Sequence, residues 1–367
     1  MTDPRVEAMA KVLIGYSLQV TGGDLVQIQG SPEGTPLLLS LYEEVLARGG
    51  HPWVQLGLDE VDEVLYTRAS EAQLDFVPKF VAEMIEEIQA SVSVWTETNT
   101  KRLTGVDPAR QARRGQAMRP LSERFLERAA AKELRWTTTL YPTPAFAQDA
   151  EMSLREFTEF VFRACLVGEE DPIGAWQEIS RRQQALIAWL EPRKEIHVLG
   201  PDTDLHLTVG GRTWINCDGH VNFPDGEIFT GPIEESVHGS IRFTYPACIY
   251  GREVEDVSLE FRGGRVVKAA AGKNEAFLRQ MLDTDPGARY VGEFAFGTNP
   301  GIQRFTKNTL FDEKIGGTVH LALGKGYPES GSRNRSAIHW DMVCDLRRGG
   351  EVRVDGAPFV RDGAFLV

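Results

Sequence analysis

The chain has 367 residues, of which 42% are hydrophobic and 25% are charged, and its formal net charge is −13. This length exceeds what one hydrophobic core usually serves, so we expect two domains. The acidic surface repels phosphates, which disfavours nucleic acids as partners. No stretch approaches about 18 consecutive apolar residues, and the start lacks a signal-peptide pattern, so we expect no membrane span and no secretory leader.

The four cysteines are scattered along the chain and form no CxxC pair. A structural zinc site built on thiolates would need closer spacing. We therefore expect reduced thiols, most of them buried, in a cytoplasmic protein. They are Cys165, Cys217, Cys248 and Cys344.

In the first half of the chain, short apolar runs that predict strands alternate with longer segments that predict helices. The expected strands are residues 25–29, 54–56, 90–95 and 137–141. The expected helices start at Thr35 and Ser153, where capping patterns occur, or span residues 76–89, 121–132 and 172–190. This rhythm is typical of an α/β domain with a mostly parallel sheet and flanking helices.

After about residue 195 the apolar residues alternate with polar ones, which predicts strands. Gly263–Gly264 lies between two such runs and indicates a hairpin. Only residues 274–283 read clearly as a helix. We therefore expect an α/β domain over residues 1–194 and a β-rich α+β domain over residues 195–367.

Two histidines lie on strands predicted near the C-terminus, over residues 318–323 and 336–343. In the second strand His339 and Asp341 point to the same face, roughly 6–7 Å apart. Such a pair can hold one metal ion, or each residue can hold one ion of a pair. An isolated His-x-Asp pattern more often lies on an ordinary solvated strand face. The prediction of a metal site therefore depends also on His320 and on the acidic residues described next.

Glu293 stands in an almost apolar run, and alternation places it on one face with Val291 and Ala295. A buried carboxylate is costly unless it is paired or bound to a metal. A salt bridge to an arginine or lysine would also explain it. The sequence therefore gives Glu293 two readings, an ion pair or a metal ligand.

Three further residues are weaker candidates. Glu227 directly follows the turn formed by residues 224–226, and an exposed hairpin acid is the alternative. Glu313 precedes Gly316–Gly317, and a solvated acid is the alternative. Tyr327 lies in a loop, where it is either a packed aromatic or a hydrogen-bond donor to an oxyanion. Carboxylates and imidazoles without thiolates favour a catalytic pair of divalent ions, such as Zn²⁺, Co²⁺ or Mn²⁺.

The segments NFPDGEIFTGP, VGEFAFGTNPGI, LFDEKIGGTVHLALGKGYP and IHWDMV resemble, in this order, the M29 family of metalloaminopeptidases. The resemblance implies a homodimer that acts on peptides with a free N-terminus, Glu293 as the bridging ligand and Tyr327 as the catalytic tyrosine. The stretch between His320 and His339 is shorter than in typical members, and the stretch from Glu313 to His320 is slightly longer. The implied metal ligands are Glu227, Glu293, Glu313, His320, His339 and Asp341.

The function predicted from these residues is hydrolysis of the N-terminal residue of a peptide by a water activated by two metal ions. Either Glu227 or Glu313 could carry the proton to the leaving amine. A phosphoesterase is one alternative, because Arg333 and Arg335 lie near His339 in the sequence. A non-catalytic α/β binding protein is another, although no glycine-rich phosphate-binding motif follows a predicted strand.

Overall fold

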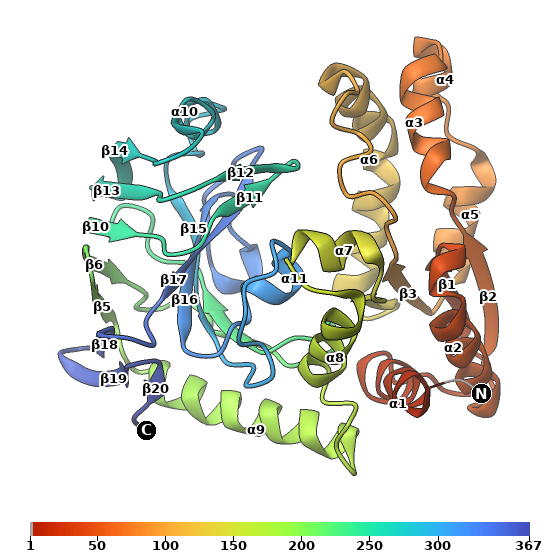
Figure 1. Cartoon of the computed structure of the whole chain (residues 1–367), viewed down its shortest axis with the longest axis horizontal. Coiled ribbons are helices and arrows are strands. Elements are labelled where there is room, and N and C mark those ends of the chain that lie inside the picture. The colour runs from red at the N-terminus through yellow and green to blue at the C-terminus, as the bar shows by residue number, and fades with distance from the viewer. Residues whose placement is uncertain (1–2) are drawn as a thin grey trace. The chain divides into compact units, whose positions relative to one another are not determined.

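The computed structural model describes residues 3–367, which form two compact units (Figure 1). The first unit extends to Ile173 and includes Gly219–Phe223, and the second comprises Gly174–Asp218 and Pro224–Val367. Most of helix α9 (Pro172–Leu190) is therefore grouped with the second unit. The two compact units are defined by contacts within the structure. That residues 1–194 and 195–367 are separate domains stays a prediction.

The first unit contains a five-stranded sheet in the order β2-β1-β3-β4-β8, and every neighbouring pair is parallel. Its strands are β1 Leu25–Gly30, β2 His51–Leu56, β3 Ala90–Trp95, β4 Arg135–Leu140 and β8 Asn222–Phe223. Its α-helices are α1 Pro4–Val12, α2 Thr35–Ala47, α3 Asp59–Arg68, α4 Glu71–Asp75, α5 Lys79–Glu87, α6 Pro108–Ala130, α7 Pro144–Asp149 and α8 Leu154–Ala164. The predicted α/β fold with a parallel sheet is confirmed.

Two helices differ from the sequence prediction. The helix expected over residues 76–89 is confirmed in a shorter form, as α5, because Pro78 precedes its first residue, Lys79, and its last residue is Glu87. Helix α6 begins at Pro108 rather than near residue 121. Asp107 caps its N-terminus, because the Asp107 side chain accepts a hydrogen bond from the N–H of Ala109. Its first half is polar and hides the helical pattern. The capping box at the start of α8 is confirmed, with Ser153 and Glu156 bonded reciprocally.

The second unit is β-rich, as predicted, with an eight-stranded and a five-stranded sheet whose strand pairs are all antiparallel. The larger, in spatial order, has β14 Arg265–Ala270, β13 Ser258–Arg262, β10 His238–Arg242, β6 Thr203–Thr208, β5 Glu195–Gly200, β18 Glu351–Val354, β19 Ala357–Arg361 and β20 Ala364–Phe365. The smaller has β17 His339–Asp345, β16 Thr318–Gly324, β15 Val291–Gly297, β9 Glu227–Thr230 and β7 Ile215–Cys217. The other strands and α-helices of this unit are β11 Ala247–Ile249, β12 Arg252–Val254, α10 Glu275–Leu282 and α11 Thr309–Asp312.

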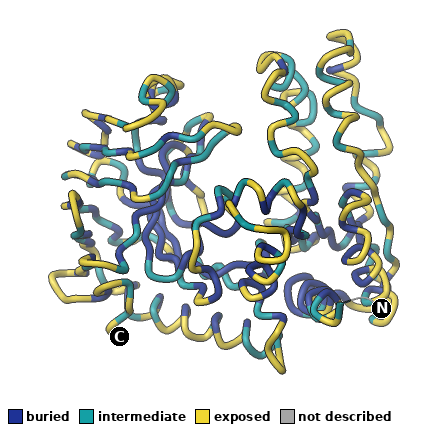
Figure 2. The backbone as a smooth tube through the Cα atoms, in the orientation of Figure 1, coloured by how far each residue is buried: buried dark blue, intermediate teal, exposed yellow. Residues whose placement is uncertain are grey.

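One hydrophobic cluster contains side chains from both of these sheets. From the five-stranded sheet it takes alternate residues, such as Phe294 and Phe296 of β15 and Leu321 and Leu323 of β16. Figure 2 shows the central strands of this sheet as buried. Because alternate side chains point to opposite faces, the residues between these apolar ones lie on the other face.

All four cysteines are free. Two of them, Cys165 and Cys344, are buried and the other two are half-buried, whereas the sequence predicts that most are buried. No helix among residues 3–367 is long and apolar enough to cross a membrane.

Candidate metal centre

The strand register brings the predicted site residues together on one face of the five-stranded sheet. Glu293 of β15 and Asp341 of β17 both lie opposite Ala322 of β16, which stands between them. His320 lies two residues before Ala322, and His339 two residues before Asp341, so both share this face. Alanine between the two acids leaves space for their side chains to converge.

A β-bulge places Glu293 in this row. The pairing of β15 with β16 shifts register between Val291 and Glu293. Val291 therefore joins the apolar cluster with Phe294 and Phe296, and the expected grouping of Glu293 with Val291 is wrong. The grouping with Ala295 is confirmed, since Ala295 pairs with His320.

The imidazole of His320 is fully buried and is held from both sides. Its Nδ1 lies 3.1 Å from the backbone carbonyl of Glu313, and a carbonyl can only accept, so Nδ1 carries the proton. Its Nε2 lies 3.1 Å from Oε1 of Glu293 and 3.6 Å from Oε2 of Glu227. This is the orientation of a metal-binding histidine, with the far nitrogen fixed by a hydrogen bond and the near nitrogen free to coordinate.

His339 repeats the arrangement on the neighbouring strand. Its Nδ1 donates to the backbone carbonyl of Lys325 over 2.7 Å. Its Nε2 lies 3.5 Å from Oδ1 of Asp341 and 4.0 Å from Oε2 of Glu293. Glu293 thus directs one oxygen toward each histidine, as a bridging carboxylate would.

Glu227 is buried rather than exposed, with only 5% of its surface accessible. Gly226 before it has φ +118°, and a Cβ there would meet Asn299 at 2.7 Å, so the turn requires glycine. The side-chain amide of Gln183 donates to the carbonyl of Glu227 over 2.8 Å. The tight turn and this hydrogen bond fix the start of β9 and aim its first side chain into the cluster.

Lys314 completes the cluster, and the sequence analysis missed it. Its side chain has 0% exposure, and its Nζ lies 2.8 Å from Glu313 Oε2 and 3.5 Å from Glu227 Oε1. In the sequence, Lys314 directly follows Glu313, and a lysine next to an acidic residue is normally expected to be exposed to solvent. The local pattern carries no signal of its burial, because the partner Glu227 is remote in the sequence.

With neutral imidazoles, which metal coordination requires, the charges of this cluster do not balance without cations. The carboxylates of Glu227, Glu293, Glu313 and Asp341 then face the ammonium group of Lys314, which leaves these groups with a net charge of −3. Burial lowers the pKa of His320, but the carboxylates of Glu293 and Glu227 raise it more, to about 9. Burial also lowers the pKa of His339, but the carboxylate of Asp341 raises it more, to about 10. Burial raises the pKa of Glu293 and of Glu313.

The donor set fits divalent metal ions. Oε2 of Glu227 and Oδ1 of Asp341 are buried and have no hydrogen-bond partner among the described residues. Such oxygens are costly to bury unless a cation meets them. The predicted ligand atoms converge within 4.8 Å in two groups, one of Glu227, Glu313 and His320 and one of Glu293, His339 and Asp341. A further group of this kind joins Glu227 to Cys217 and Asp225.

Comparison with known proteins decides the family. Residues 2–365 match the family described as Thermophilic metalloprotease (M29). The chain belongs to this family. The resemblance stated from the sequence motifs is therefore confirmed over nearly the whole chain.

Relatives of this M29 protein share its full length. It is 29% identical to "Aminopeptidase T" of Thermus aquaticus, with 98% of each chain covered. It is 25% identical to "Aminopeptidase 2" of Geobacillus stearothermophilus, with 98% of this chain and 95% of that protein covered. The solved structure of wild-type AmpT from Thermus thermophilus superposes with a TM-score of 0.85 at 27% identity, covering 99% of both chains.

Tyr327 lies at the margin of the cluster of carboxylates and histidines around Glu293, and 38% of its surface is exposed. Its ring meets that of His339 edge-on, with centroids 5.1 Å apart, and also contacts the ring of Phe229. Burial of the hydroxyl, together with the carboxylates of Glu293 and Asp341, raises the pKa of Tyr327 well above its ordinary value. Its hydroxyl therefore stays protonated and remains a hydrogen-bond donor.

Proposed function

We propose that this protein is an aminopeptidase that uses two divalent metal ions to remove the N-terminal residue of a peptide. The observation that carries the proposal is Glu293, whose two oxygens face two separately anchored imidazoles. The names of the full-length relatives support the peptide substrate.

The residues that would hold the ions fall into the two groups described above. Glu227, Glu313 and His320 form one group, and His339 and Asp341 form the other with the bridging Glu293. Ions bound there, of which Zn²⁺, Co²⁺ and Mn²⁺ suit these ligands, would lower the pKa of a water toward 7 and polarise the scissile carbonyl.

The remaining groups position and protonate the reactants. The hydroxyl of Tyr327, held against His339, donates a hydrogen bond to the oxyanion that develops at the scissile carbonyl. Proton transfer to the leaving amine falls to Glu227 or Glu313, the two carboxylates that lie beside Lys314. Lys314 donates to Glu313 and limits the accumulation of negative charge. A carboxylate of the cluster receives the α-amino group of the substrate.

A phosphoesterase would need cations that reach the substrate. The two candidates, Arg333 and Arg335, are exposed. The one cation within the cluster, Lys314, is already engaged by two carboxylates. This arrangement favours the peptidase.

Hydrolysis of an aminoacyl-p-nitroanilide by the metal-loaded protein tests the proposal directly. We expect turnover that a chelator abolishes and that added metal restores. An N-acetylated aminoacyl anilide is the matched control and should not be cleaved, because it lacks the free amine. Cleavage of p-nitrophenyl phosphate without cleavage of the anilide would overturn the proposal in favour of the phosphoesterase.

We also propose a cytoplasmic homodimer. The free thiols fit a reducing compartment. Helix α3 buries no residue, and exposed apolar side chains gather on α3 and near α5. They are Leu58, Val61, Val64, Phe76 and Phe80. Light scattering of the purified protein should give twice the mass of 40.8 kDa.

A further inference from the structure

A second cluster of histidines lies on the eight-stranded sheet, apart from the residues assigned to catalysis. His197 of β5 pairs with His206 of β6, and His206 pairs with His238 of β10. The rings stack in a row, with centroids 3.7 Å apart for the first pair and 4.9 Å for the second. Three of the seven histidines of the chain therefore stand side by side on adjacent strands.

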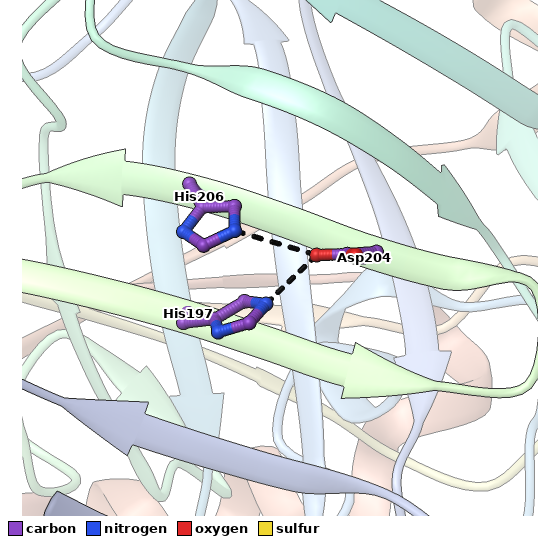
Figure 3. Close-up of side chains that lie close together, drawn as sticks. All are labelled: His197, Asp204 and His206. Atoms are coloured by element: carbon purple, nitrogen blue, oxygen red, sulfur yellow. Dashed lines mark hydrogen bonds and ion pairs between the residues drawn. The ribbon is translucent and has the colours of Figure 1, made fainter. Parts of the chain in front are cut away.

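An aspartate joins two of these rings. Asp204 lies two residues before His206 on β6 and so projects from the same face. Its Oδ1 lies 2.7 Å from Nε2 of His197 and 3.4 Å from Nε2 of His206 (Figure 3). Two imidazole nitrogens and one carboxylate oxygen thus converge within 4.8 Å of one another.

One of the two nitrogen–oxygen separations matches the spacing of ligands around a tetrahedral metal ion, and the other is shorter. Ligands at 2.0–2.1 Å from zinc stand about 3.3 Å from one another. The 3.4 Å between His206 and Asp204 already has this value, and the 2.7 Å between His197 and Asp204 must open by a few tenths of an ångström. Asp204 is exposed and can move, because its side chain is 68% accessible.

The sheet holds the two histidines in place from behind. The residues that alternate with them, Ile196, Val198, Leu205 and Leu207, belong to the hydrophobic core. On the neighbouring strand Arg353 lies opposite His197, but its side chain donates to Glu351.

We propose that His197, Asp204 and His206 form a third metal site, which takes a borderline divalent ion such as Zn²⁺ or Cu²⁺. Imidazole nitrogens with one carboxylate suit these ions better than Mg²⁺ or Ca²⁺. Three protein ligands leave the fourth position to water, since the site lies at the surface. The bound ion would join β5 to β6 and occupy a place distinct from the cluster around Glu293.

His238 supplies a matched control. It stacks on His206 in the same row, but its Nδ1 donates to the carbonyl of Ser236 and it lies outside the converging set. Replacing His238 removes one imidazole from the row without removing a ligand. Any loss of metal that is specific to His206 is therefore due to the site and not to the number of surface histidines.

Equilibrium dialysis against Zn²⁺ tests the proposal, with the metal counted per chain. We compare H206Q, D204N and H238Q, each alone and combined with E293Q/H339Q, which removes ligands of the proposed catalytic ions. We expect H206Q and D204N to bind one Zn²⁺ fewer than their parent in both backgrounds, and H238Q to bind the same number.

Folding and function are followed separately from the metal count. H206Q should keep the thermal midpoint and anilide turnover of the unsubstituted protein measured without excess Zn²⁺, because its side chain lies on the exposed face. Added Zn²⁺ should raise the midpoint of the parent more than that of H206Q. Equal Zn²⁺ counts in H206Q, D204N and their parents, or an equal loss in H238Q, would overturn the site. This result does not depend on whether the protein proves to be an aminopeptidase.

Discussion

The two histidine clusters of the second unit use the same kinds of side chain in different surroundings. Around Glu293, two of the carboxylates, Glu227 and Glu293, are buried. With neutral imidazoles, the protein does not balance the charge of the four carboxylates of that cluster. Around Asp204 the single carboxylate is exposed and is shared by two imidazoles. Water can solvate the second cluster but not the first, so only the buried cluster requires cations.

The clusters also differ in how their histidines are anchored. His320 and His339 each donate through Nδ1 to a backbone carbonyl, which fixes the ring before any ion arrives. For His197 and His206, the hydrogen-bond partner is Asp204, which would itself be a ligand. We therefore expect tight binding at the preorganised, buried cluster and weaker binding at the exposed one.

The largest effect should come from Glu293→Gln. The amide removes the bridging charge, and we expect anilide turnover to fall by at least about 10³-fold, several kcal/mol of transition-state stabilisation. The metal count should fall as well. Glu235→Gln, at an exposed glutamate, is the control and should leave both unchanged. A Glu293→Gln protein with full turnover would remove the main distinction between the clusters.

Lys314→Met tests the charge balance of the buried cluster. Removing the ammonium group of Lys314 leaves the carboxylates of Glu227 and Glu313 without this partner. Breaking a buried ion pair costs about 3–5 kcal/mol, so we expect a large loss in the free energy of unfolding of the metal-free protein. Metal should restore part of it. Urea titrations with and without metal measure the free energy of unfolding of the metal-bound and the metal-free protein. If Lys314→Met lowers it equally in both, the account is contradicted.

Tyr327→Phe tests the oxyanion assignment. It removes only a hydroxyl, and we expect kcat to fall by about 10²–10³-fold while the metal count stays the same. Tyr250→Phe, at a tyrosine that is 72% exposed, is the control. A change in KM alone would indicate that Tyr327 binds substrate and does not act on the transition state.

The smallest expected effect is on the free energy of unfolding, and it comes from the half-buried ion pair of Asp345 and Arg347. Arg347 donates to Asp345 over 2.6 Å, and the Tyr245 hydroxyl donates to Asp345 over 3.0 Å. Burial raises the pKa of Asp345, but the hydrogen bonds of Arg347 lower it more, so it lies below its ordinary value. The stabilisation is therefore present above the unfolded pKa of about 3.9 and is lost as pH falls through the folded pKa.

Asp345→Asn should accordingly destabilise the fold by about 1–2 kcal/mol at pH 7 and by less as the pH approaches 3. Denaturant unfolding at several pH values measures the difference. A difference that stays constant with pH would show that the carboxylate charge is not involved.

Much of the site follows from the sequence because strand alternation is a local rule. It places His339 beside Asp341 and separates Glu293 from Phe294 without knowledge of the fold. The parallel sheet of the first unit was likewise predictable from its alternating strands and helices.

The rest depends on contacts between distant segments. The burial of Lys314 depends on Glu227, the two histidine anchors are backbone carbonyls that no side-chain pattern marks, and the bulge before Glu293 is set by its pairing with β16. The row from His197 to His238 also appears only once β5, β6 and β10 are in register. Single-strand patterns do not carry this information.

Anomalous diffraction from crystals grown with Co²⁺ or Zn²⁺ tests the central claim most directly. The account predicts two strong peaks about 3.5–4 Å apart, one beside His320 and one beside His339, with an oxygen of Glu293 bound to each. A single peak, or two peaks neither of which contacts Glu293, would contradict it.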